Sequence, residues 1–103
     1  MGYKEDMHEV IIILDDIISL LESTDKKFQP YANQYKYFRN ECGCAENEEE
    51  ANNVRREILR TYSQGMGSFN DLALCTEDGH LLSEHKRFYR LKTKLFETLR
   101  DQL

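Results

Sequence analysis

The sequence predicts a mainly α-helical protein: one domain over residues 1–103, built like a four-helix bundle with a small β-hairpin before the last helix. Apolar residues recur every three or four positions along most of the chain, which is the spacing of amphipathic helices. The 103 residues include one proline and five glycines, a composition that suits helices. This length supports a single core. Only over residues 72–82 does the spacing of the apolar residues become shorter, as in β-strands.

The clearest element is a helix predicted over residues 3–22. Its apolar stripe is formed by Met7, Val10, Ile11, Leu14, Ile17, Ile18 and Leu21. Ile12 falls on the opposite side, beside Glu5, Glu9 and Asp16. An isoleucine surrounded by carboxylates is one way to build a contact surface, because interfaces join an apolar centre to a polar rim. The alternatives are a single exposed apolar residue or burial by a neighbouring helix.

A second helix is predicted to begin near Pro30, since proline suits a first helical turn, and to end at Gly43. One face carries Tyr31, Tyr35, Phe38 and Cys42. Tyrosines at helical spacing are most often core residues whose hydroxyls reach water. The face is therefore interpreted as core.

A third helix is predicted after an acidic run that contains Glu46, Glu48, Glu49 and Glu50. Carboxylates at a helix start are stabilised by the helix dipole, although like charges repel there and a basic partner would relieve the repulsion. The inward positions are Ala51, Val54, Ile58 and Tyr62, and the helix is predicted to end at Gly65. Arg55, Arg56 and Arg60 are predicted to face outward.

The hairpin is predicted from two short apolar runs, residues 72–75 and 80–82, on either side of the Asp78-Gly79 turn signal. Ser83 suits the cap of a last helix that runs to the carboxyl terminus. This helix is predicted to bury Phe88, Leu91, Leu95 and Leu99 and to expose Arg87, Arg90 and Lys94.

Enzyme chemistry is not predicted. The three histidines are isolated, and the chain has neither a nucleophile elbow nor a phosphate loop with its lysine. A zinc site would need Cys42, Cys44 and Cys75 with His80 or His85, but the paired Cys-x-x-Cys pattern of strong zinc sites is missing. We therefore expect free thiols, no metal and no cofactor. Free thiols and the lack of a leader or membrane-spanning pattern favour the cytoplasm.

The net charge of −5 is distributed unevenly. Residues 1–50 carry twelve Asp or Glu against five Lys or Arg, whereas residues 51–103 carry seven against nine. An acidic half disfavours direct binding to nucleic acid, which needs clustered cations, and favours a basic partner. The alternative is that the acidic residues only maintain solubility.

The second half of the chain carries a distinctive glycine turn, made by Gly65, Met66, Gly67, Ser68 and Phe69. It follows Tyr62 and precedes Asp71-Leu72 and the turn at residues 77–79. From residue 51 onward the chain resembles a family of small bacterial proteins similar to the immunity proteins of contact-dependent growth inhibition and polymorphic toxin systems. The resemblance implies a small cytosolic protein that neutralises a toxin domain, with the glycine turn maintaining the fold.

The sequence thus predicts an immunity protein whose acidic surface covers a basic nuclease toxin domain. The predicted partner-binding residues are Glu5, Glu9, Ile12, Asp16, Glu46, Glu48, Glu49 and Glu50. The alternative is a self-associating scaffold or regulator that pairs through Ile12 and exposed aromatic residues.

Overall fold

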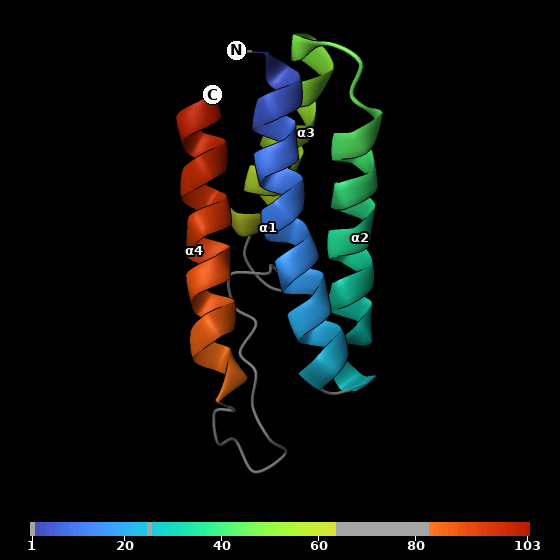
Figure 1. The fold of residues 1–103 in the computed structure, drawn as a ribbon, viewed down its shortest axis with the longest axis vertical. Helices are drawn as coiled ribbons and strands as arrows, with labels where there is room; N and C mark the ends of the chain where they lie inside the picture. The colour runs from blue at the N-terminus through green and yellow to red at the C-terminus, as the bar shows by residue number, and fades with distance from the viewer. Residues whose placement is uncertain (1, 25, 64–82) are drawn as a thin grey trace.

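The structure is a computed structural model that describes residues 2–24, 26–63 and 83–103 (Figure 1). The described residues form helices α1 (Tyr3–Thr24), α2 (Gln29–Cys44), α3 (Glu48–Ser63) and α4 (Glu84–Gln102), with a short 3-10 helix, η1 (Lys26–Phe28), before α2. The prediction of a mainly helical protein with four helices is confirmed. The hairpin predicted at residues 72–82 and the helix end predicted at Gly65 lie outside the described residues, and both stay predictions.

Helix α1 is the centre of the bundle. In Figure 1 it stands between α2 and α4 with α3 behind it, and it contacts all three. It can do so because its apolar stripe is broad, and eight of its residues are buried: Met7, Val10, Ile13, Leu14, Ile17, Ile18, Leu20 and Leu21. None of the helices in the described part of the chain is both long and apolar enough to cross a membrane.

The other helices each bury one stripe against α1. From α2 and η1 the core receives Phe28, Ala32, Tyr35, Phe38 and Cys42, from α3 Ala51, Val54 and Ile58, and from α4 Phe88, Leu95 and Leu99. Tyr31 and Leu91, predicted to be core residues, are half-buried at its edge. The predicted stripes of α2, α3 and α4 are therefore confirmed wherever the structure describes them.

One predicted helix end and one predicted helix cap need correction. Gly43 does not end α2, because the helix continues to Cys44 and the backbone becomes extended only at Ala45. Gly43 also lacks the left-handed conformation that usually ends a helix at glycine. Ser83 precedes α4 as predicted, but its hydroxyl donates to the Glu84 carboxylate at 3.1 Å and caps no backbone N–H.

The prediction that Arg55 faces outward is wrong, since its side chain is fully buried. The guanidinium donates from Nε to Oε1 of Gln102 at 2.9 Å and from Nη1 to Oδ1 of Asn52 at 2.5 Å. Its Nη1 also donates to the Glu48 carboxylate at 3.4 Å, and its Nη2 lies 3.7 Å from the Asp6 carboxylate. We call Asp6, Glu48, Asn52, Arg55 and Gln102 the Arg55 cluster.

The Arg55 cluster connects three helices. Gln102, in the last turn of α4, also donates from Nε2 to the backbone carbonyl of Asp6 in α1 at 3.1 Å. A buried guanidinium requires such partners, because a charge without them is strongly destabilised inside a protein. Burial of Arg55 therefore depends on the relative position of α1, α3 and α4.

Ion pairs also join α1 to α2. Arg39 pairs with Asp15, and Lys36 pairs with Glu22 at 2.6 Å. Hydrogen bonds from Lys36 and then Gln29 lower the pKa of the Glu22 carboxyl from its ordinary value. In the described part of the chain, Asp15 and Glu22 thus have cationic partners within the protein, unlike Glu41 and Glu57, which are described below.

Candidate protein-binding site

The predicted residues of α1 form one continuous surface. Glu5, Glu9, Ile12 and Asp16 are all exposed, and Ile12 keeps 49% of its surface accessible. Their spacing along the helix places them on one side, opposite the buried residues of α1. We call these four residues the α1 stripe. The alternative that a neighbouring helix buries Ile12 is therefore wrong for the part of the protein described here.

The acidic run at residues 46–50 forms the start of α3. Asn47 caps this helix, because its Oδ1 accepts the backbone N–H of Glu50 at 2.9 Å. The Glu50 carboxylate in turn accepts the backbone N–H of Glu46 at 2.6 Å, and Glu48 contacts Arg55. Helix-start chemistry is thus present for Glu48 and Glu50. Whether any of the four glutamates binds a partner stays a prediction.

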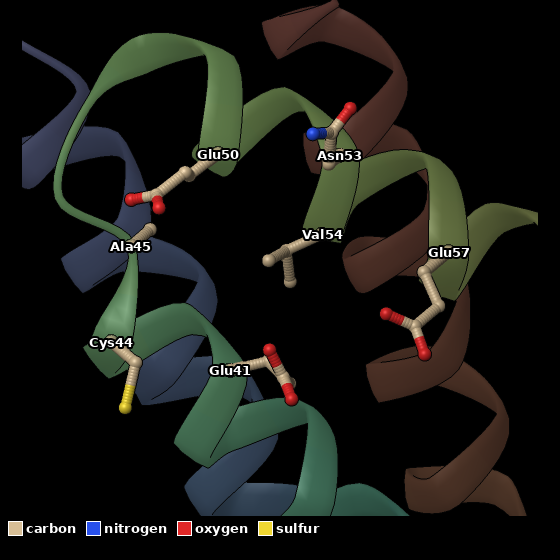
Figure 2. A pocket seen from close by; sticks show the side chains of 7 residues that line it. All are labelled: Glu41, Cys44, Ala45, Glu50, Asn53, Val54 and Glu57. Carbon is tan, nitrogen blue, oxygen red and sulfur yellow. The ribbon is translucent and has the colours of Figure 1, made fainter.

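An open groove lies between α2 and α3. It has a volume of about 290 Å³, is open to solvent, and is lined by Glu41, Cys44, Ala45, Glu50, Asn53, Val54 and Glu57. Figure 2 shows the carboxylates of Glu41 and Glu57 turned toward each other across the space beneath Val54 in this view. The groove therefore combines three carboxylates with a small apolar wall of Ala45 and Val54, of which Val54 exposes only 6% of its surface. We call it the acidic groove.

The negative field of the acidic groove acts on a neighbouring tyrosine. Tyr37 lies one helical turn before Glu41 on α2 and is 46% exposed. The charges of Glu41 and then Glu57 raise the pKa of the Tyr37 hydroxyl, and hydrogen bonding to both carboxylates adds to the effect. One phenol from α2 and two carboxylates from different helices therefore interact electrostatically at one place.

The two described cysteines differ in environment. Cys42 is buried in the core, and burial raises the pKa of its thiol to about 12 despite the opposing charge of Arg55. Cys44 is exposed at the acidic groove. Within the described ranges no three His, Cys, Asp or Glu residues are arranged to hold a metal ion. Cys75 and His80 lie outside those ranges.

The α1 stripe and the acidic groove are separate surfaces. The stripe lies on the side of α1 that turns away from the core, whereas the groove opens between α2 and α3, which contact the buried side of α1. Of the predicted residues, the structure places only Glu50 in the lining of the groove. Glu41, Glu57 and Tyr37 were missed, because only the packing of α2 against α3 brings them together.

The comparison with protein families matches residues 32–83, just over half of the chain. The chain belongs to the family described as Domain of unknown function (DUF6966). The DUF6966 region contains every residue that lines the acidic groove, and it excludes the α1 stripe. Searches of curated proteins and of solved structures found no match.

Proposed function

We propose that this DUF6966 protein is an inhibitor that binds a basic protein and neutralises it. We further propose that the bound protein is a nuclease toxin domain, as the resemblance to immunity proteins implies. The observation that carries the proposal is the acidic groove, where carboxylates from α2 and α3 surround an apolar wall. Protein interfaces join these two kinds of surface.

The charge state of the groove favours a basic partner. Within residues 2–24, 26–63 and 83–103, Glu41 and Glu57 form no ion pair with Lys or Arg, unlike Asp15 and Glu22. Uncompensated carboxylates leave a negative potential at the surface, which attracts a cationic partner and speeds its association. The α1 stripe adds three more exposed carboxylates on another side of the protein.

The mechanism of neutralisation follows from what a nuclease needs. Nucleases hold phosphate with Lys and Arg, so an acidic protein that covers these residues competes with the nucleic acid for them. Steering by charge accelerates the encounter, and burial of the apolar wall then contributes affinity that salt does not screen. The inhibitor therefore needs no catalytic group of its own.

The test is reconstitution of the complex. The tagged protein is used to capture the product of the reading frame next to its own gene, and the purified pair is titrated by calorimetry and assayed for nuclease activity. We expect one-to-one binding at about nanomolar affinity, as is common for specific interfaces of standard size, together with loss of the nuclease activity. Absence of binding, or binding without inhibition, would count against the proposal.

A second candidate function is self-association, which the exposed Ile12 favours. An apolar residue with about half of its surface accessible, beside the three carboxylates of the α1 stripe, is one requirement for a contact between two copies. Sedimentation velocity at micromolar concentration separates the two functions. A stable homodimer that Ile12→Lys dissociates would favour a scaffold or regulator, and a monomer would exclude it at that concentration.

A further inference from the structure

The size of the acidic groove indicates what part of a partner it holds. Ligand pockets for drug-sized molecules have volumes of about 300 to 1,000 Å³ and enclose most of the ligand. The groove has about 290 Å³ and is open on one side. This volume, near the lower end of that range, suits one long side chain that enters from a protein surface, and the three carboxylates of the lining disfavour a nucleotide.

The lining of the groove indicates the chemistry of that side chain. Val54 and Ala45 are the apolar contributions, and the carboxylates of Glu41 and Glu57 converge beneath Val54 (Figure 2). A side chain with an aliphatic stem and a cationic end matches both parts, because its stem buries apolar surface while its charge meets the carboxylates. Among natural side chains only arginine and lysine have this form.

We infer that the acidic groove seats one arginine side chain of the basic partner, with the guanidinium between Glu41 and Glu57 and the stem against Val54. This inference rests on the proposed function, since it names the group that the partner inserts. Arginine is favoured over lysine because its planar fork can donate to two carboxylates at once, and because it stacks on aromatic rings such as that of Tyr37.

The electrostatics of Tyr37 support the same location. Its pKa is raised chiefly by the charge of Glu41 and then by that of Glu57, so the negative field of both carboxylates reaches the phenol. A guanidinium between the two carboxylates would cancel much of this field. Tyr37 is therefore a reporter of occupancy, because its hydroxyl would share both carboxylates with the guanidinium.

The test uses N-acetyl-arginine amide as the probe, followed by NMR of the full chain. We expect chemical-shift changes centred on Tyr37, Glu41 and Glu57 when the arginine amide is added. The lysine amide should bind at least threefold more weakly, and the uncharged citrulline amide should not bind. The double variant Glu41→Gln and Glu57→Gln should bind the arginine amide at least fivefold more weakly. The matched control, Glu5→Gln with Glu9→Gln, removes the same charge from the α1 stripe and should change affinity less than twofold.

A second variant keeps the carboxylates in place. Asn53 is exposed at the edge of the groove, and Asn53→Lys would tether a competing cation there, lowering affinity for the arginine amide at least threefold. Dispersed amide spectra check that each variant is folded. Equal weakening by the groove and control variants, or shifts spread over all acidic surfaces, would overturn the arginine seat.

The outcomes separate this inference from the proposed function. If the toxin partner binds the groove variants as tightly as wild type, the arginine seat is wrong while the inhibitor function stands. If the arginine amide binds at the groove but no protein is neutralised, the proposed function is wrong and the seat stands as a cation site. If the free protein sediments as a dimer that arginine amide dissociates, the occupant is a second copy, and the inferred partner is wrong.

Discussion

Arg55→Ala tests the burial of a charged side chain in the core of the protein. The side chain is fully buried and donates to Gln102, Asn52 and Glu48, with Asp6 at ion-pair distance. Truncation removes the stem and all of these interactions together. We expect a large loss of folding stability, although the variant retains every apolar core residue.

The expected magnitude follows from the contacts. Loss of two buried methylene groups costs roughly 1.6 kcal/mol at about 0.8 kcal/mol each. Hydrogen bonds to Gln102 and Asn52 contribute about 1 kcal/mol each, and that to the exposed Glu48 contributes less. Removing a buried charge also recovers part of its desolvation cost. The free energy of unfolding should therefore fall by about 2 to 3 kcal/mol, a large part of the roughly 5 to 15 kcal/mol typical of a domain.

Urea denaturation followed by circular dichroism measures this change. Arg55→Met keeps most of the stem and removes the charge, so it should lose only about 1 kcal/mol, as replacing buried ion pairs with apolar residues often shows. The matched control is Arg56→Ala on the exposed side of α3, which should change stability by less than about 0.5 kcal/mol. Equal effects of Arg55→Ala and Arg56→Ala would refute the buried cluster.

Three further predictions concern individual side chains. Asn47→Ala removes the cap of α3 and should lower the free energy of unfolding by about 1 kcal/mol in urea. At pH 8 a maleimide should label exposed Cys44 and spare Cys42, whose burial raises its pKa to about 12, as peptide mass spectrometry would show. Glu41→Gln should lower the pKa of Tyr37 in an ultraviolet titration. Because folding raises that pKa, the associated stabilisation of the folded protein is present below pH 10 and is lost as the pH rises further. An unchanged Tyr37 pKa in Glu41→Gln would contradict the effect of the groove carboxylates on Tyr37.

The helices could be predicted from the sequence because each carries a regular apolar stripe. The α1 stripe was predicted for the same reason, since all four residues lie on one helix and need no knowledge of tertiary packing. Arg55 was assigned to the surface by its charge alone. Its spacing from Ala51 and Ile58 did place it on the buried face of α3, but the partners that make burial favourable come from α1 and α4.

The acidic groove could not be predicted in the same way. Glu41 and Glu57 lie sixteen positions apart on two different helices, at the edges of their exposed faces. Which edges meet depends on how α2 and α3 cross, and apolar periodicity does not determine that angle. Sequence reasoning therefore reached Glu50, which belongs to a visible acidic run, and missed the two carboxylates that face each other.

The Arg55 cluster has a consequence for motion. Helix ends ordinarily fray one by one, because the last turn of each helix is held by few contacts. Here the first turns of α1 and α3 and the last turn of α4 share one guanidinium, and Gln102 hydrogen-bonds to Asp6 as well. If any one of these helix ends opened, the buried Arg55 guanidinium would lose some of its polar partners. In hydrogen exchange the three ends should therefore open as one cooperative unit, with a common free energy of opening.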